Sequence, residues 1–523
     1  MSKPIHTLTS QLGELYRKIK NIFFLKRVRI GIFVSAFLFV FIIVIITAWQ
    51  HEPFFSFDES NTIRIASYPP QTIARLLSYE QNFPAYYILI HSIMSLLDDY
   101  VHAIILVQLL VWGGSVIVFF LITKYIGVSF NYRLLFTLLF SLCSSVSYYA
   151  YYVRMYGLVL LLFLGILWLS YRYIYSHNVR YIHLMLPVLF GIVVLHPSGL
   201  LIVVAQLLLV FLIVPYGSVR MIYAVCSAGI LGAGTLLLHK NRQLYEIYVE
   251  GVKYANEAQM NYHEIPQHLF FSAESQFDWL VFMVVCGSFY IFIANRLWRN
   301  TEGVLLSAYG CIFFIITLVT RGVYQPRHYI YFVPILLLIM LSSISYIRRK
   351  NVKAIIVIGL ICIFTGSFVK FYINQTVLNV AYKYDCQQLS NLDSGIIITT
   401  VPYINILSYC ITQDNQLYSI SPTGLINVSS LSEEEVIQYQ VTTGGEYITS
   451  LKKESYRNFL VERMNVYQND LKMIDVLHTH KNMYYIPSIS SRSQSMYAEE
   501  LELFVDYVYK GSPIVGVFVF TQN

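Results

Sequence analysis

The sequence predicts a polytopic α-helical membrane protein with about eleven transmembrane helices, followed by a C-terminal α/β domain outside the membrane. Of its 523 residues, 56% are hydrophobic and only 12% are charged, whereas soluble domains carry about a quarter charged residues. Long apolar runs recur along the chain, and each is long enough to cross a hydrocarbon core of about 30 Å as a helix. No Asp or Glu occurs between Asp99 and Glu246, so acidic side chains are kept out of the predicted bilayer region.

One apolar segment is excluded from the predicted spans. The stretch from Phe83 to Leu97 has 15 residues and carries His91, which makes it short for a span. We interpret it as a helix lying in or near the membrane interface. The predicted spans cover residues 31–49, 101–122, 134–150, 155–171, 181–196, 199–215, 219–238, 279–295, 303–320, 328–346 and 353–371.

Lys and Arg residues set the predicted orientation. With eleven spans, 18 basic residues fall in the N-terminus and alternate short loops, and 8 fall in the longer loops on the other side. Basic residues gather on the cytoplasmic side of membrane proteins. Counting 83–97 as a span would place the basic loops outside. The sequence therefore predicts a multi-pass cell-membrane protein with a cytoplasmic N-terminus and an extracytoplasmic C-terminal domain.

The predicted domains are a transmembrane domain at 1–373, with outer loops 50–100 and 239–278, and an extracytoplasmic α/β domain at 374–523. The second domain holds 9 basic and 15 acidic residues, a net charge of −6, so the total of +7 leaves +13 for the rest. Binding of nucleic acid requires a basic polar domain. Because this polar domain is acidic, a nucleic-acid partner is not expected. Within it, strands are expected at Gly395–Val401 and Ile514–Phe520, and helices are expected at Glu433–Gln438, Ser455–Val466 and Ala498–Val508.

Ionisable and polar residues collect at the outer ends of the predicted spans. Such residues are functional candidates, because burial in a membrane is costly for them. In the first outer loop they are Asp58, Glu59, Arg64 and Glu80, and in later outer turns they are Arg154, His196, Arg321, Tyr324, Arg327 and His328.

Each candidate also has a structural alternative. Asp58 and Glu59 would serve equally as a solvated acidic pair capping a juxtamembrane helix. Arg154 would serve as an arginine snorkelling to lipid headgroups. His196 would serve as a hydrogen-bonded histidine beside a proline turn, and Arg327 as an interfacial anchor among tyrosines.

The order of five segments resembles a known family. FDESNTIRIAS, FPAYYILIH, YYVRMYGLVLLL, LHPSGLL and QPRHYIYFVPILLL are similar to segments of bacterial glycosyltransferases of the GT-C superfamily, akin to protein O-mannosyltransferases and the lipid A aminoarabinose transferase. The resemblance covers roughly residues 30–346. It implies a cell-envelope enzyme that uses a polyprenyl-phosphate sugar.

The resemblance also implies roles for the candidates. Asp58 would engage the acceptor as catalytic base, with Glu59 and Glu80 as further catalytic candidates. The carrier phosphate would be held by residues at outer helix ends, namely Arg64, Arg154, His196, Tyr324, Arg327 and His328. The chain has Asn82-Phe83-Pro84-Ala85-Tyr86-Tyr87 where the family often has His-Pro-Pro-Leu-Tyr-Tyr. It has Tyr152-Val153-Arg154-Met155-Tyr156 where the family often has Glu-Ala-Arg-Met-Tyr, so a His and a Glu of the family pattern are missing. The sequence therefore defines no cofactor and leaves a divalent metal as an open alternative.

The chemistry follows from the residue types themselves. Arginine binds two phosphate oxygens and keeps its charge, and a carboxylate can accept the proton of an acceptor hydroxyl. The leaving group is already a phosphate, so a second carboxylic acid is not required, unlike in glycoside hydrolysis. A single displacement would invert the anomeric centre. The expected partners are a polyprenyl-phosphate sugar donor, a lipid, glycan or protein acceptor, and membrane lipids.

Two other classes remain as alternatives. A transporter would need a polar path with broken helices near the midplane, and the predicted spans contain almost no acidic residues. A lipid flippase or wall-associated scaffold would use the C-terminal domain as a binding module.

Overall fold

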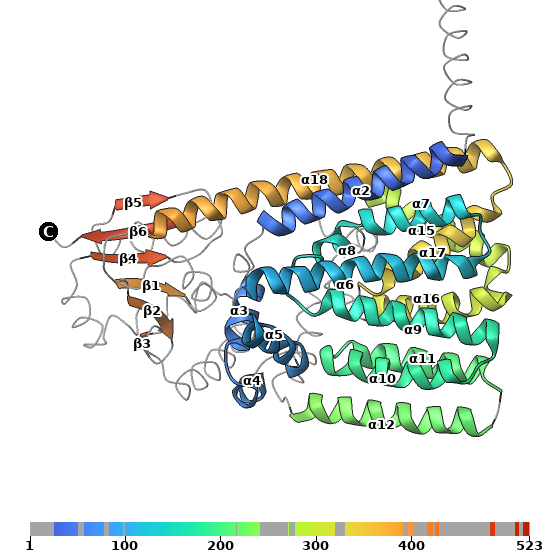
Figure 1. The fold of residues 1–523 in the computed structure, drawn as a ribbon, viewed down its shortest axis with the longest axis horizontal. Helices are drawn as coiled ribbons and strands as arrows, with labels where there is room; N and C mark the ends of the chain where they lie inside the picture. The colour runs from blue at the N-terminus through green and yellow to red at the C-terminus, as the bar shows by residue number, and fades with distance from the viewer. Residues whose placement is uncertain are drawn as a thin grey trace, which may run out of the picture.

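A computed structural model describes residues 26–50, 57–77, 83–97, 100–215, 217–240, 270, 278–319, 330–390, 396–400, 416–421, 424–427, 482–486, 508–511 and 516–521. Within these residues, a helical bundle is followed by a β-sheet (Figure 1). The helices predicted at Glu433–Gln438 and Ser455–Val466, and the one predicted from Ala498, lie outside the described residues.

Every apolar run predicted as a span coincides with a helix. These helices are α2 (Lys26–Gln50), α6 (Tyr100–Thr123), α7 (Phe130–Leu142), α9 (Tyr156–Ser176), α10 (Arg180–Leu195), α11 (Gly199–Ile213), α12 (Ser218–Lys240), α15 (Asp278–Ala294), α16 (Thr301–Val319), α17 (Phe332–Tyr346) and α18 (Lys350–Ser390). Short 3₁₀ turns, η2 (Lys124–Ile126) and η3 (Leu297–Arg299), lie between some of them.

The prediction of a multispan helical membrane protein is confirmed. Among the described residues, five helices are long and apolar enough to cross a membrane, at Phe33–Gln50, Tyr100–Ile126, Tyr156–Ser176, Ser218–Leu237 and Lys350–Thr376. The other bundle helices are shorter and apolar, so the count of eleven spans stays a prediction. Helices α9 and α17 are buried along most of their length and form the centre of the bundle.

The span predicted at 134–150 is not one continuous helix. Helix α7 ends at Leu142, Cys143 is extended, and the short helix α8 (Ser144–Tyr148) follows. The carbonyl of Cys143 accepts the backbone N–H groups of Val146 and Ser147 and also the Ser147 hydroxyl. Three of the four residues after Cys143 are serines. Serine side chains that form hydrogen bonds with the backbone compete with a continuing helix.

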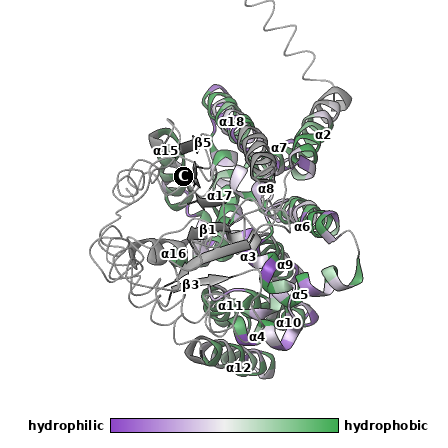
Figure 2. Cartoon of the chain, turned by 90° about the vertical axis from the view of Figure 1, so that its left-hand side faces the viewer, coloured by the Kyte–Doolittle hydropathy of each residue, from purple (hydrophilic) through white to green (hydrophobic). Residues whose placement is uncertain are grey.

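Three short helices cover one end of the bundle. They are α3 (Phe57–Ala66), α4 (Pro70–Leu76) and α5 (Pro84–Leu96), and Figure 1 shows them between the bundle and the sheet. Helix α5 is the segment interpreted as interfacial, and its 13 residues measure only about 20 Å. Viewed from this end in Figure 2, hydrophilic segments stand out around α3, α4 and α5 against mostly hydrophobic bundle helices.

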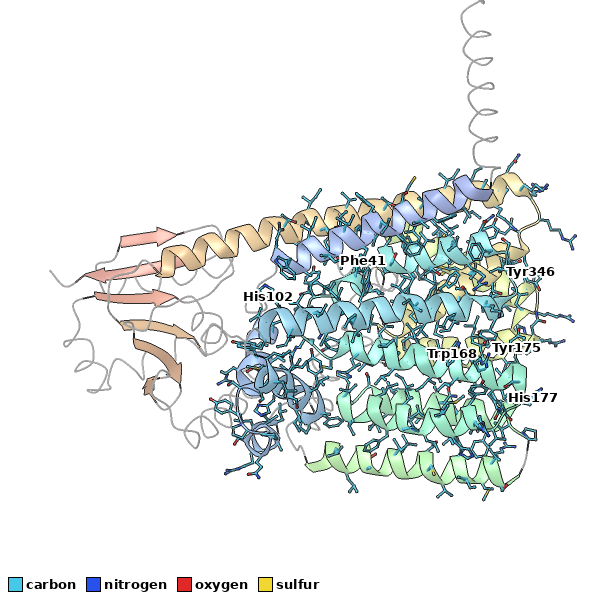
Figure 3. The ribbon with its side chains drawn as sticks, viewed as in Figure 1. Phe41, His102, Trp168, Tyr175, His177 and Tyr346 are labelled. Carbon is cyan, nitrogen blue, oxygen red and sulfur yellow. The ribbon has the colours of Figure 1, made fainter. Side chains whose placement is uncertain are left out.

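The opposite end of the bundle carries the basic connections. Figure 3 shows Tyr175 in the last turn of α9, His177 directly after α9 and Tyr346 at the end of α17. All three lie at the end away from His102 and the short helices. Arg172 and Arg180 flank the first of these connections, and Arg348 and Arg349 occupy the second. The orientation of the chain in the membrane, which the positive-inside pattern predicts, stays a prediction.

Helix α18 continues past the predicted domain boundary at residue 374. Its 41 residues extend about 60 Å, beside α2 along the bundle and on towards the sheet (Figure 1). The division into two domains stays a prediction.

The C-terminal strands form one mixed sheet. They are β1 (Ile396–Thr400), β2 (Gln416–Ser421), β3 (Gly424–Asn427), β4 (Asn482–Ile486), β5 (Val508–Gly511) and β6 (Gly516–Thr521), in the order β3-β2-β1-β4-β6-β5. Strand β1 pairs in parallel with β2 and β4, so that Ile397 lies between Leu417 and Tyr484, and the remaining pairs are antiparallel. Strands β1 and β6 coincide with the two runs expected to be strands.

Candidate active site

The candidate site forms where α3 and α5 pack against the turn between α8 and α9. Pro84 occupies the first turn of α5, where its missing N–H costs nothing. Gly157, in the first turn of α9, lies so close to the turn that an added Cβ would be 3.2 Å from the carbonyl oxygen of Tyr149. The glycine therefore allows α9 to begin directly against the turn that carries Arg154.

Arg154 is buried at this junction, with 6% of its surface exposed. Its Nη1 donates to the hydroxyl of Tyr87 on α5 at 3.0 Å and to Oγ1 of Thr62 on α3 at 3.3 Å. Both of these partners are neutral hydroxyl groups. The site thus holds a fixed cation at the end of the bundle.

Glu59 holds the same turn from α3. Its side chain is fully buried, and its Oε1 accepts the backbone N–H of Val153 at 2.9 Å. A carboxylate that accepts a backbone N–H makes a charge-assisted hydrogen bond. Glu59 therefore fixes the backbone immediately before Arg154.

Gln108, on α6, forms hydrogen bonds with two residues of the site. Its Nε2 donates to the Tyr86 hydroxyl at 2.5 Å and to the backbone carbonyl of Arg154 at 3.4 Å. Burial raises the pKa of Tyr86 well above its usual value; the nearby charge of Arg154 opposes this and that of Glu59 adds to it. Tyr86 therefore stays a neutral hydroxyl at physiological pH.

An aromatic cluster supports the other side of the turn. Tyr148 stacks on Tyr152 with ring centroids 4.4 Å apart, and it meets Phe371 of α18 edge-on at 5.7 Å. Tyr151 meets Tyr372 of α18 at 6.3 Å. The turn before Arg154 is thus packed between the short helices and α18.

His196 serves the turn between α10 and α11. It is buried, its Nδ1 lies 2.7 Å from the Ser198 hydroxyl oxygen, and the same nitrogen accepts the Ser198 backbone N–H at 3.2 Å. Its ring is 5.5 Å from that of Tyr156. The contacts with Ser198 match the structural alternative for His196. The ring contact nevertheless places His196 beside Tyr156, which follows Arg154 by two residues in the sequence.

Arg64 lies on α3 and is half-buried. Its Nη2 donates to Oδ1 of Asn61, one turn earlier, at 3.1 Å. This hydrogen bond joins the two side chains across one turn of α3.

The remaining candidates are placed in part or not at all. The backbone of Asp58 is the second residue of α3 and directly precedes Glu59. Glu80, Arg321, Tyr324, Arg327 and His328 lie outside the described residues. Within the part of the chain that is described, no three His, Cys, Asp or Glu residues come together as a group able to hold a metal ion.

The structure adds site residues that the sequence analysis missed. They are Thr62, Tyr86, Tyr87 and Gln108. Gln108 offered a signal, because it is the one amide side chain in the apolar run 101–122, and polar residues within such runs often bond neighbouring helices. Tyr86 and Tyr87 lie in FPAYYILIH, which carries the family resemblance.

This helical membrane bundle, with short helices of the first loop packed on one end, shares its fold with solved structures of ArnT. No protein-family model and no curated protein sequence matches the chain, so the likeness rests on structure.

The similar solved structures include ArnT from Cupriavidus metallidurans in the apo state, with a TM-score of 0.50, 10% sequence identity, and coverage of 93% of this chain and 98% of ArnT. ArnT bound to undecaprenyl phosphate gives a TM-score of 0.51 at 10% identity, covering 94% and 98% of the two chains. The oligosaccharyltransferase of Archaeoglobus fulgidus, tethered to an acceptor peptide, gives 0.47 at 11% identity, covering 96% and 75%.

Proposed function

We propose that this protein transfers a sugar from a polyprenyl-phosphate donor to an acceptor hydroxyl at the outer membrane face, with inversion at the anomeric carbon. The observation that carries the proposal is the buried guanidinium of Arg154, which donates to the hydroxyls of Tyr87 and Thr62 at the end of the bundle. The GT-C fold supports it, as does the undecaprenyl phosphate bound to the similar ArnT.

Arg154 is suited to bind the phosphate of the carrier. A guanidinium in a site of low dielectric attracts an anion strongly, and its planar fork contacts two phosphate oxygens. Tyr87 and Thr62 contact the same Nη1 atom, and this fixes the direction of the fork. Arg64, His196, Tyr324, Arg327 and His328 are the further candidates for the donor site.

Asp58 is the proposed base. It accepts the proton of the acceptor hydroxyl while the acceptor oxygen attacks C1 of the sugar. The C1–O bond to phosphate breaks, its electron pair passes to the phosphate oxygen, and the carrier leaves as a polyprenyl phosphate monoester. Because the attack comes from the face opposite the leaving group, the anomeric configuration inverts.

Glu59 is proposed to support the site rather than to transfer the proton. Its carboxylate is occupied by the Val153 N–H, and successive helical residues point about 100° apart. Glu80 is the carboxylate to examine next if Asp58 is not the base.

The purified protein tests this proposal when incubated with a panel of polyprenyl phosphosugars while release of the lipid phosphate is followed. We expect release with at least one donor, and Asp58→Asn should bind that donor normally but react about 10²–10⁴-fold more slowly. Asp393→Asn is the matched control in the C-terminal region. Near-normal turnover by folded Asp58→Asn would exclude this base and direct attention to Glu80. The absence of release with every donor would favour the transporter, flippase or scaffold alternatives.

A further inference from the structure

A groove is lined by residues of α7 and of the start of α18. The start of α18 lies at the end of the bundle away from α3–α5 (Figure 1). The groove encloses about 330 Å³, which falls within the range of small-molecule sites. Its lining consists of Tyr132 from α7 and Lys350, Lys353, Ala354, Val357 and Ile358 from α18.

The α18 residues of the groove form one stripe. They recur every three or four positions, so they share a helix face. The two lysines occupy the first turn, and Ala354, Val357 and Ile358 continue along the apolar helix. Positive charge thus lies at the start of α18, and the apolar residues of the groove follow it along the helix.

Lys353 is already held in place. It is half-buried, its Nζ donates to the Ser345 carbonyl at 2.9 Å, and the same nitrogen lies 5.6 Å from the centroid of the Tyr132 ring. An ammonium group carries three donors, so the bond to Ser345 leaves donors for an anion. Lys350, one turn earlier, is exposed and adds a second positive charge.

We propose that this groove binds an anionic phospholipid, with the headgroup phosphate between Lys350 and Lys353 and an acyl chain along Val357 and Ile358. Basic pockets between membrane helices are suited to anionic headgroups. The apolar residues beside the lysines favour a lipid over a free phosphate, because a lipid has an acyl chain that can pack along them while its headgroup stays at the lysines. On the predicted orientation this is the cytoplasmic leaflet, so the groove is distinct from the proposed donor site.

The test measures retention of phosphatidylglycerol by the purified full chain, using native mass spectrometry after titration in detergent. Phosphatidylcholine and inorganic phosphate serve as separate arms. The double variant Lys350→Gln/Lys353→Gln should lose about 30-fold in phosphatidylglycerol affinity. The control Arg348→Gln/Arg349→Gln removes the same charge from the same connection, outside the groove lining, and should lose much less.

A second variant separates the groove from charge alone. Ala354→Trp fills the groove and keeps both lysines, so it should also weaken phosphatidylglycerol retention. Each variant is checked for an unchanged thermal midpoint in phosphatidylcholine. Equal losses in the two double variants would overturn the proposal in favour of general charge attraction. Normal retention by Ala354→Trp, equal retention of phosphatidylcholine, or full competition by inorganic phosphate would overturn it as well.

Discussion

The hydrogen bond between Glu59 and Val153 allows the two carboxylates of α3 to be assigned different roles. Glu59→Gln keeps an oxygen that can accept the Val153 N–H and removes the charge. Glu59→Ala removes the acceptor altogether and leaves that N–H buried. If Glu59 supports the turn, the two substitutions should therefore differ, with the alanine variant the more damaged.

The size of the difference follows from the contact. A hydrogen bond to a charged acceptor contributes about 1.5–3 kcal/mol and one to a neutral acceptor about 0.5–1.5 kcal/mol, so Glu59→Gln should lose about 1 kcal/mol, or ~5-fold. A buried N–H left without an acceptor costs about 1–3 kcal/mol, which corresponds to ~5- to 160-fold. The loss in Glu59→Ala should appear in both stability and donor affinity, because the displaced backbone carries Arg154.

Three measurements on both variants check this expectation: the thermal midpoint in detergent, donor affinity, and the rate of lipid-phosphate release. Glu59→Gln should keep most of its turnover, and Glu59→Ala should lose stability and affinity together. The reasoning is refuted if Glu59→Gln keeps the parent's stability yet is as inactive as Glu59→Ala. That result would show that the charge is required and would make Glu59 the base.

Three further expectations test the role of Arg154 and the orientation of the chain. Arg154→Ala should weaken donor binding about 10- to 100-fold, and Arg154→Lys should restore binding only in part. The control Arg172→Ala, at the other end of α9, should leave donor binding unchanged. Parent-like binding by Arg154→Ala would make this residue a lipid anchor. Tyr87→Phe should lower donor affinity in a titration, because it removes a hydroxyl that holds Arg154 Nη1. The control Tyr181→Phe removes the comparable hydroxyl bonded to Arg172 and should leave the affinity unchanged. Equal affinities of the two variants would show that the Tyr87 hydroxyl does not orient Arg154. A reporter fused after Phe371 should give an extracytoplasmic signal, and a cytoplasmic signal would overturn the eleven-span orientation.

The helices of the bundle could be predicted because hydropathy and length are local properties of the chain. Apolar runs marked the bundle helices. Helix α5 has 13 residues, as does α7, so its interfacial position stays a prediction. The end of α7 at Cys143 was missed, because the extended backbone of this one residue leaves no mark in the hydropathy of the surrounding run. The continuation of α18 past residue 374 was also missed, because hydropathy marks where an apolar run ends and not where its helix ends.

The site could be predicted only as a set of unusual residues. Arg154 was identified because a charge at a helix end is costly in a membrane, but its hydrogen bonds to Thr62 and Tyr87 join residues 92 and 67 positions apart. No spacing rule in a single sequence links such distant partners. The burial of Glu59 and the bond of Gln108 to the Arg154 carbonyl depend on the same tertiary packing.

The surroundings of Arg154 bear on how much an anion would gain from binding there. A flexible surface arginine loses rotamer entropy when it binds an anion, whereas one already ordered loses little. The Arg154 guanidinium is fixed by side chains from α3 and α5, and the turn before it is packed against Phe371 and Tyr372 of α18. The rotamer entropy of Arg154 is therefore lost during folding, through packing against elements from distant parts of the chain. A phosphate would then bind a guanidinium that is already oriented.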